Sequence, residues 1–489
     1  MTQITASIQE IGNQLKRQAS LIPNLESSVK SFLKHEGGIF KLLTDARKSV
    51  TQAASTNSLP DVEKAATAMQ ALIPKINIMV EDNPELKSNE TVTQFMRELT
   101  DTADKLMYAR RSLIDLTQNF NEKLVVFPSN LIAGIFGFKQ QQGLQTPQSG
   151  QHVEVSSDEM KDVKIWALHF LPIKLMTHHQ LIQRNKQKST FIMVLFVLFI
   201  VGASYLIAVG LQYDLSFVGI ALIFSGIVSF TSYWWSDKVV LAISQARPVT
   251  KAEFFDYYTV TENLTLGQRL PMPKLYVIDD TAMNAFATGR DPQHAVVCAT
   301  TGLLGQLTRS EIEGVVAHEL SHVQNYDIRL MSVVTVLVGM IALLSDWALR
   351  MTFWGRSGRS RDDSRESSQV QIIFLAVGVL LALLSPLIAQ VIQLAISRKR
   401  EFLADASGIG MTRNPSGLIS ALKKISADRE PLEAANKATA HLYFSNPLKN
   451  THGAVGWFAK LFQTHPPVTE RIAALEAILW KIKFFTWQN

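Results

Sequence analysis

The chain has 489 residues, enough for two to four domains, and 47% of them are hydrophobic. Its 48 Lys and Arg against 42 Asp and Glu give a net charge of +6, and no dense basic patch interleaved with aromatic residues is present, which disfavours a nucleic-acid partner. Cys298 is the single cysteine, so an intramolecular disulfide and a thiolate zinc cluster are both excluded.

The N-terminal region predicts a bundle of helices. Its first residues, MTQITASIQEIGNQLKRQAS, lack the apolar core of a signal peptide, so we expect this region to stay on the side where it is made. Apolar residues recur at three- and four-residue steps, and breaks are expected at Pro60 and Pro84. A long amphipathic run then extends from Glu90 to about Val126. Three or four long antiparallel helices are the simplest fold.

Two segments of this region, LKRQASLIPNLESSVKSFLKHE and FNEKLVVFPSNLIAGIFGF, resemble the LemA family, and the resemblance covers most of residues 10–138. It implies a helical bundle and no established chemistry. The next residues, 139–162, are rich in Gln, Ser and Gly and predict a linker.

A pair of membrane-spanning helices is expected after residue 190. Phe191–Leu211 carries no charge over 21 residues and would span ~30 Å at ~1.5 Å per residue. A second apolar run, Phe217–Trp235, ends in aromatic residues that suit a membrane interface. Two core helices of a soluble protein are the less favoured interpretation. Two later apolar runs, at 330–349 and 369–396, are less certain as full spans.

The charges beside these runs indicate an orientation. Arg184, Lys186 and Lys188 precede the first run, whereas the link after it carries only Asp214. The positive-inside rule then places the N-terminal and catalytic parts in the cytoplasm. The Arg-rich stretch 350–368 would lie outside if both later runs span, against the rule. A cytoplasmic or partly immersed hairpin is the alternative.

The stretch VVAHELSHVQNYD contains His318, Glu319 and His322 in H-E-x-x-H spacing. Residues four apart share a helix face, so both histidines can bind one zinc ion through one ring nitrogen each. Glu319 can then act as the general base on a water whose pKa the metal has lowered. The alternative is a helix with two surface histidines and a glutamate.

A third metal ligand must come from elsewhere, because no further histidine follows at a metal-binding spacing. In ISRKREFLADASG, Glu401 and Asp405 lie four apart on one helix face. Glu401 is a candidate ligand, and Asp405 is a candidate acceptor for the free N–H of a zinc histidine. An acidic pair in a surface charge cluster would give the same spacing, so the spacing alone leaves both interpretations open.

Four motifs in order, MNAFATG, AHELSHVQNYD, SRKREFLADASG and HPPVTERI, closely resemble the HtpX-type membrane zinc metallopeptidases, relatives of the CAAX prenyl protease type. The resemblance covers about residue 191 to the C-terminus. It implies one Zn²⁺ per chain bound by His318, His322 and Glu401, with Glu319 as the general base. It also implies a mainly α, multi-pass protein of the inner (plasma) membrane, with a gluzincin-type α+β metallopeptidase domain and a small β-sheet.

Two of these motifs contain further candidates. MPKLYVIDDTAMNAFATG predicts strands at Leu275–Ile278 and Asn284–Ala287, and a strand at the lip of a cleft can bind extended peptide. Asn284 is a candidate donor to a developing oxyanion, or else a turn residue. The resemblance suggests that His465 stabilises the transition state, although the two prolines after it also suit a helix start. Arg471 is expected to orient His465 or a nearby carboxylate.

The predicted organisation is a LemA-like bundle (1–138), a linker (139–162), a juxtamembrane segment (163–190), a transmembrane hairpin (191–236), and a peptidase domain in two parts (237–329 and 397–489) separated by two membrane or membrane-associated helices (330–396). The predicted function is a zinc-dependent endopeptidase that hydrolyses misfolded membrane proteins on the cytoplasmic side. The alternatives are a membrane scaffold or adaptor with an inactive or regulatory metal site, and a prenyl-peptide processing protease. The predicted partners are protein or peptide substrates and the lipid bilayer, and a homo-oligomer stays open.

Overall fold

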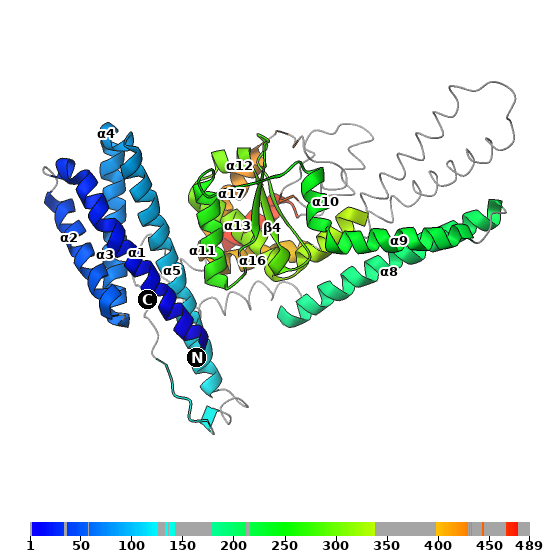
Figure 1. Cartoon of the computed structure of the whole chain (residues 1–489), viewed down its shortest axis with the longest axis horizontal. Coiled ribbons are helices and arrows are strands. Elements are labelled where there is room, and N and C mark those ends of the chain that lie inside the picture. The colour runs from blue at the N-terminus through cyan, green and yellow to red at the C-terminus, as the bar shows by residue number, and fades with distance from the viewer. Residues whose placement is uncertain are drawn as a thin grey trace. The chain divides into compact units, whose positions relative to one another are not determined.

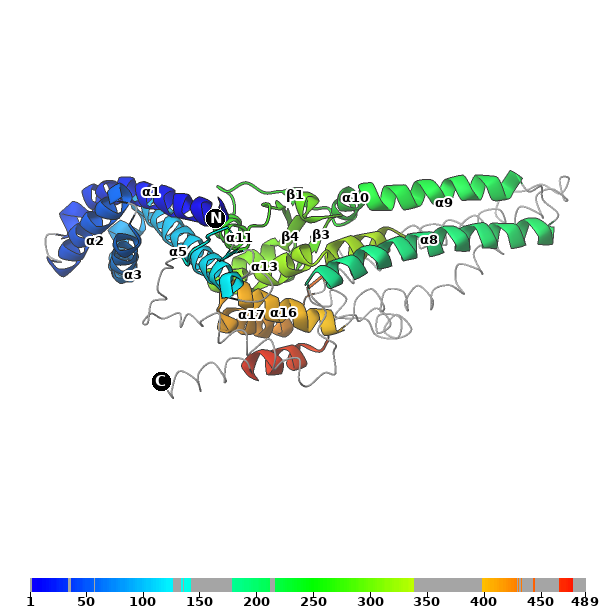
Figure 2. The same cartoon turned by 90° about the horizontal axis from the view of Figure 1, so that it is seen from below.

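The computed structural model forms two compact units, and each is described by itself. The first comprises residues 1–160 with 262–270, and the second comprises residues 161–261 with 271–489. Within them the structure describes residues 2–33, 37–56, 58–125, 133–134, 136–141, 178–211, 216–337, 398–428, 430, 432, 443–444 and 466–477. Figures 1 and 2 show the elements in two views.

The first unit contains a bundle of long helices. They are α1 (Thr2–Leu33), α2 (Gly37–Thr56), α3 (Leu59–Asp82), the short α4 (Pro84–Lys87) and α5 (Glu90–Val125). α1 packs on both α2 and α5, and α2 packs on α3 (Figure 1). The apolar stripes of these helices face one another in a core that includes Ile11, Leu15, Leu25, Leu72 and Leu99. Burial of these stripes, more than helix propensity, stabilises the bundle.

The breaks between these helices follow from local chemistry. Ser58 caps α3 by accepting a hydrogen bond from Asp61 N, and Pro60 lies in the first turn, where an N–H would have no helical partner. Pro84 opens α4 directly after Asn83 in the same way. Both breaks were predicted from the sequence and are confirmed, as is the long final helix.

Two long apolar helices open the second unit. α8 (His178–Leu211) and α9 (Ser216–Trp234) lie side by side in both views, and α10 (Ser236–Ile243) follows α9 (Figures 1 and 2). By length and composition α8 could cross a membrane, and α9 passes the same test together with α10 as a pair bent by 83°. Many of their apolar side chains are exposed, among them Phe191, Leu198, Ile220, Ile223 and Ile227. Water disfavours such a surface, whereas lipid does not.

The remaining predicted apolar runs are described only in part. α8 begins at His178, so residues 178–190 of the predicted juxtamembrane segment are continuous with the first apolar run. Residues 327–337 form a helix at the start of the third run, and Val333 and Leu337 pack with Phe196 of α8. The rest of that run and all of the fourth lie outside the described residues, so their membrane spans stay predictions.

A small mixed sheet lies at the centre of the second unit. Its strands are β1 (Arg247–Pro248), β2 (Lys274–Ile278), β3 (Ala285–Thr288) and β4 (Val296–Thr300), in the order β1-β2-β4-β3. β2 and β4 are parallel, and the two outer pairs are antiparallel. The two predicted strands are present, but β4 lies between them, which leaves β3 at an edge of the described sheet. Cys298 lies buried in β4 as a free thiol.

Helices surround this sheet. They are α11 (Phe255–Gln268), the 3₁₀ turn η1 (Pro292–His294), α12 (Thr301–Gln306), α13 (Arg309–Gln324), α16 (Arg398–Thr412) and α17 (Pro415–Ala427). α13 packs against β3 and β4, and both α16 and α17 pack on α13 (Figure 1). Glycine permits α16 to approach α13 closely, because a Cβ on Gly408 of α16 would lie 3.2 Å from His318 N. The described chain is therefore mainly helical, with one small mixed sheet.

Candidate metal centre

The start of α13 is fixed by a capping box and by α17. Thr308 is the N-cap, and its N–H donates to Glu311 Oε2 at 2.8 Å. Glu311 also accepts hydrogen bonds from Lys424 Nζ at 2.7 Å and from Ser420 Oγ at 2.6 Å, both on α17. Burial disfavours the charged carboxylate, but these hydrogen bonds outweigh it and lower the pKa of Glu311 to about 2. The helix with the H-E-x-x-H motif is thereby held to its neighbour.

Three buried side chains meet between α13 and α16: His318, His322 and Glu401. His318 Nε2 lies 3.2 Å from His322 Nε2 and 3.6 Å from Glu401 Oε2, while His322 Nε2 lies 3.6 Å from Glu401 Oε1. One ligand atom from each residue lies within 4.8 Å of the others. α13 places the two histidines one turn apart on one face, and α16 supplies the carboxylate.

A buried ion pair orients His318. Its Nδ1 lies 2.8 Å from Asp405 Oδ1, and because a carboxylate can only accept, the ring proton is on Nδ1. Arg471 donates from Nε and Nη2 to the two oxygens of Asp405, at 2.8 and 2.6 Å. Burial disfavours the charged Asp405, but Arg471 and His318 outweigh it and hold the pKa of Asp405 below its usual value. His318 Nε2 therefore presents its lone pair to the other two side chains.

Asp327, at the start of the helix after α13, orients His322. The Nδ1 atom of His322 lies 3.2 Å from Asp327 Oδ2. Burial disfavours the charged imidazole, but Asp327 and the nearby Glu401 and Glu319 outweigh it and raise the pKa of His322 to about 9. The three side chains thus form a site that attracts positive charge.

The arrangement fits a metal ion. Two imidazole nitrogens and a carboxylate lie 3.2–3.6 Å from one another, close enough to bind one cation together. Tetrahedral ligands at about 2.0–2.1 Å from a metal lie about 3.3 Å apart, which matches these distances. Carboxylates on the far side of both rings are usual at metal sites, because they fix the ring orientation. The described residues supply two nitrogen ligands and one oxygen ligand.

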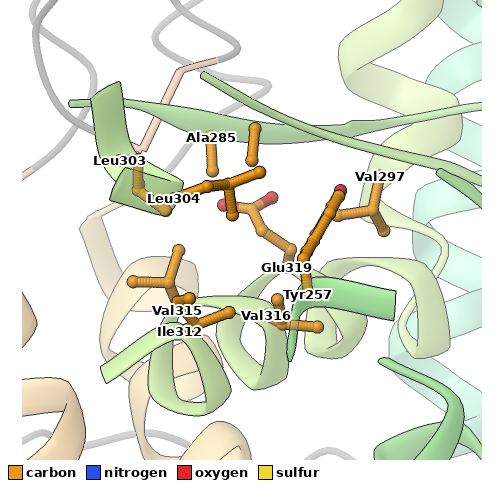
Figure 3. Close-up of a pocket in the computed structure, with 10 residues that line it drawn as sticks. Tyr257, Ala285, Val297, Leu303, Leu304, Ile312, Val315, Val316 and Glu319 are labelled. Carbon is orange, nitrogen blue, oxygen red and sulfur yellow. The ribbon is translucent and has the colours of Figure 1, made fainter. Parts of the chain in front are cut away.

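Glu319 lines a small, largely apolar pocket on the sheet side of α13 (Figure 3). Tyr257 of α11, Ala285 of β3 and Val297 of β4 also line it. The Tyr257 hydroxyl is buried and has no hydrogen-bond partner among the described residues. Burial also raises its pKa well above the usual value. A hydroxyl buried in this way disfavours the folded state.

The other sequence candidates lie in different places. Asn284 is buried just before β3, where its Oδ1 accepts a hydrogen bond from the next N–H at 3.1 Å and its own N–H donates to Thr300 Oγ1 at 3.0 Å. Arg471 contacts a carboxylate, Asp405, of the metal centre. His465 lies outside the described residues.

Sequence patterns did not identify four residues that the structure brings to this region: Asp327, Tyr257, Phe444 and Asn185. The ring of Phe444 packs edge-on against His318, with centroids 4.9 Å apart, and its N–H donates to Ala285 O at 2.8 Å. Asp327 carried a weak signal, an acidic residue five positions after the second histidine. The other three have no local pattern that marks them.

Two family models match the chain. The LemA family model matches residues 7–156, and the model of Peptidase family M48 matches residues 258–479. The second match contains the three side chains of the metal centre, Glu319 and Arg471. Both resemblances found in the sequence are thus confirmed.

Curated relatives agree with the second match. A protease HtpX homolog of Lactobacillus helveticus is 41% identical over 304 residues, which are 61% of this chain and 99% of the relative. Homologs of Streptococcus uberis and Thermoanaerobacter pseudethanolicus are 40% and 39% identical, and the match covers 98% of each. The crystal structure of S. mikatae Ste24p matches with a TM-score of 0.33 and 16% identity over 94% of this chain and 99% of that one, too low to establish a shared fold. The chain therefore belongs to the HtpX family of proteases, and it is a metallopeptidase with a LemA-like segment in front.

Proposed function

We propose that the protein is a zinc-dependent membrane endopeptidase that cleaves misfolded membrane proteins on the cytoplasmic side. The observation that carries this proposal is the buried cluster of His318, His322 and Glu401, with Glu319 next to the first ligand. Two imidazoles and one carboxylate are a donor set of catalytic zinc sites, which keep a position for water. A structural zinc site would be closed by a fourth ligand, and the described residues place none in this cluster.

Each side chain then has a chemical role. Bound zinc would polarise the scissile carbonyl and lower the pKa of a water molecule. Glu319 would accept a proton from that water and pass it to the leaving amine. Its pocket is mostly apolar, and exclusion of bulk water strengthens the interaction of a charge with its neighbours. Asp405 and Asp327 would keep both imidazoles in one tautomer throughout.

An extended substrate would bind along β3. Ala285 O points away from β4, since it accepts a hydrogen bond from Phe444 N. Side chains and backbone groups alternate along a strand, so the backbone of Ala287 faces the same outer edge. A peptide added there would pair from Ala287 onward and pass the pocket that contains Glu319. We propose that Asn284, at the start of this strand, donates to the developing oxyanion, and that His465 also stabilises it.

The membrane assignment is supported by the apolar, exposed faces of α8 and α9. Such faces suit lipid, and the proposed site would then lie close to the bilayer surface. Basic residues in α8 ahead of its apolar run favour a cytoplasmic position for the catalytic part. Membrane proteins that have lost their packing would expose the extended segments that an edge strand can bind.

The test compares wild type with Glu319→Gln, purified in detergent with stoichiometric zinc. Both proteins are expected to hold one zinc ion, and only wild type is expected to cleave casein. Loss of a general base lowers the rate about 10²- to 10⁴-fold. Equal zinc contents with no cleavage of several substrates by either protein would contradict the proposal and favour the scaffold alternative. Membership of a protease family already disfavours the scaffold alternative.

We further propose that the LemA-like bundle recruits substrate, covers the catalytic cleft or mediates oligomerisation. Its helices form a compact unit with a core of its own. A truncation that lacks residues 1–140 distinguishes the roles. Unchanged rates on the same substrates would exclude the first two roles. An unchanged number of chains per particle in solution would exclude the third.

A further inference from the structure

Asn185 lies in the polar first part of α8, six residues before the apolar run that begins at Phe191, and its side chain is buried in the protein. Its Nδ2 donates to Asp327 Oδ1 at 2.7 Å and to Asn325 O at 2.9 Å. Figure 2 shows α8 beside α13 and the helix that follows it. A polar side chain that is buried in protein needs such partners, because an unpaired one is costly there. The partner here is the carboxylate that orients His322.

The turn that Asn185 contacts contains an unusual backbone conformation. Tyr326 has a φ of 59°, in the left-handed region that bulky side chains seldom adopt. Tyr326 lies at the break between α13 and the helix that begins at Asp327, and Asp327 Oδ2 lies 3.2 Å from His322 Nδ1. Asn185 binds the residues on both sides of Tyr326 and therefore closes the turn. Lys186, the next residue of α8, places its Nζ 4.5 Å from the centre of the Tyr326 ring.

Asp327 connects three helices. Its Oδ1 also accepts a hydrogen bond from Arg400 Nη1 at 3.1 Å, and Arg400 precedes the ligand Glu401 on α16. The same carboxylate thus contacts α8, α16 and, through His322, α13. Without Asn185, the Asp327 carboxylate would keep its hydrogen bond from Arg400. The turn at Tyr326 would lose both hydrogen bonds that it receives from α8.

We infer that Asn185 is a positioning residue for the metal centre. It holds Asp327, Asp327 holds the imidazole of His322, and metal affinity thereby depends on the placement of the membrane helix α8. Asn185 itself touches none of the three ligands. This inference rests on the proposed zinc site.

The test replaces Asn185 by leucine, which has nearly the same shape and no donor. The control is Thr190→Val, which also replaces a polar side chain of α8 by an apolar one of similar shape. The Thr190 hydroxyl donates only within α8, to Lys186 O. Zinc affinity is measured by competition with a chelator in the full-length protein. Asn185→Leu is expected to weaken zinc binding about tenfold, which is the lower end of the range for residues that support a metal ligand. The variant is also expected to change kcat more than it changes KM. Thr190→Val is expected to match wild type.

A double-mutant cycle with Asp327→Asn separates positioning from a general structural effect. If Asn185 acts through Asp327, its replacement adds little once Asp327 is changed, whereas independent effects would multiply. The inference would be overturned if the losses of zinc affinity in the two single variants multiply in the double variant. Wild-type zinc affinity in Asn185→Leu would also overturn it. If Asn185→Leu does not fold, Asn185→Asp is used instead. Aspartate keeps the shape and polarity of asparagine but repels the Asp327 carboxylate, so this variant is also expected to weaken zinc binding. Wild-type zinc affinity in Asn185→Asp would equally overturn the inference. A wild type without zinc would overturn the proposed function and this inference together.

Discussion

Arg471 contacts both oxygens of Asp405, through Nε at 2.8 Å and through Nη2 at 2.6 Å. Arg471, Asp405 and His318 are all buried, so each polar atom depends on the others. The guanidinium also lies over the ring of Phe444, 4.5 Å from its centre. The relationship matters because Asp405 Oδ1 is the acceptor for His318 Nδ1, so the Arg471 side chain determines where that imidazole points.

Arg471→Lys is expected to weaken zinc binding and lower kcat by about tenfold or more. Lysine keeps the positive charge but cannot make two parallel hydrogen bonds to one carboxylate. Zinc competition and kcat measure the two effects. The control is Arg309→Lys, where the arginine pairs with the exposed Asp256 at 2.8 Å, and it is expected to behave as wild type. A fully active Arg471→Lys with normal zinc affinity would show that charge alone suffices.

Part of the site could be predicted because helical periodicity is local. His318 and His322 share a face of α13 by their four-residue spacing, and Glu401 and Asp405 share a face of α16 for the same reason. The structure places all four where the spacing predicted, with Asp405 on the far side of His318. The domain boundaries and the roles of these residues stay predictions.

The rest depends on tertiary packing, which local patterns do not contain. Asp327 follows Tyr326, which adopts a left-handed conformation, and this break lies between His322 and its partner. Asn185 contacts Asp327, which is 142 positions later in the chain. The order of the sheet is a similar case. β4 pairs with both predicted strands, and its parallel pairing with β2 requires a crossover that no short motif marks.

Glu311→Gln is expected to destabilise the second unit by about 1–3 kcal/mol, because it removes the negative charge of a buried carboxylate that pairs with Lys424 and accepts a hydrogen bond from Ser420. The pKa of Glu311 is about 2 in the folded protein, below its usual 4.5, so its contribution is complete above pH about 4.5 and is lost as the pH falls toward 2. Thermal unfolding from pH 7 to pH 3 measures this. The difference between wild type and variant should shrink at low pH.

The control for this prediction is Glu476→Gln. Glu476 pairs with Lys423 at 2.9 Å, but both side chains are more than half exposed, so the variant is expected to lose less than about 1 kcal/mol. If Glu311→Gln loses no more than Glu476→Gln at pH 7, the charge of the Glu311 carboxylate does not stabilise the second unit.

Cys298 is expected to resist thiol reagents in the folded protein. It is fully buried in β4, and burial raises the pKa of its thiol far above the usual value, so little thiolate forms. Labelling then requires opening of the sheet. Added zinc is expected to slow the labelling, since a ligand of the folded state stabilises it. The rate is measured with a maleimide at several zinc concentrations; rapid labelling of folded protein would contradict the placement of β4.

Tyr257→Phe is expected to lower kcat/KM while the stability is unchanged or rises by about 1 kcal/mol. The hydroxyl is buried without a partner among the described residues, so its removal relieves an unsatisfied group in the folded protein. The same hydroxyl lies in the pocket that Glu319 lines, where a substrate or water would give it a partner (Figure 3). Zinc content, thermal unfolding and cleavage rates are measured in parallel. A reduced rate together with normal zinc content and higher stability would place Tyr257 in the substrate site. A wild-type rate would show that the hydroxyl contacts neither substrate nor water during the reaction.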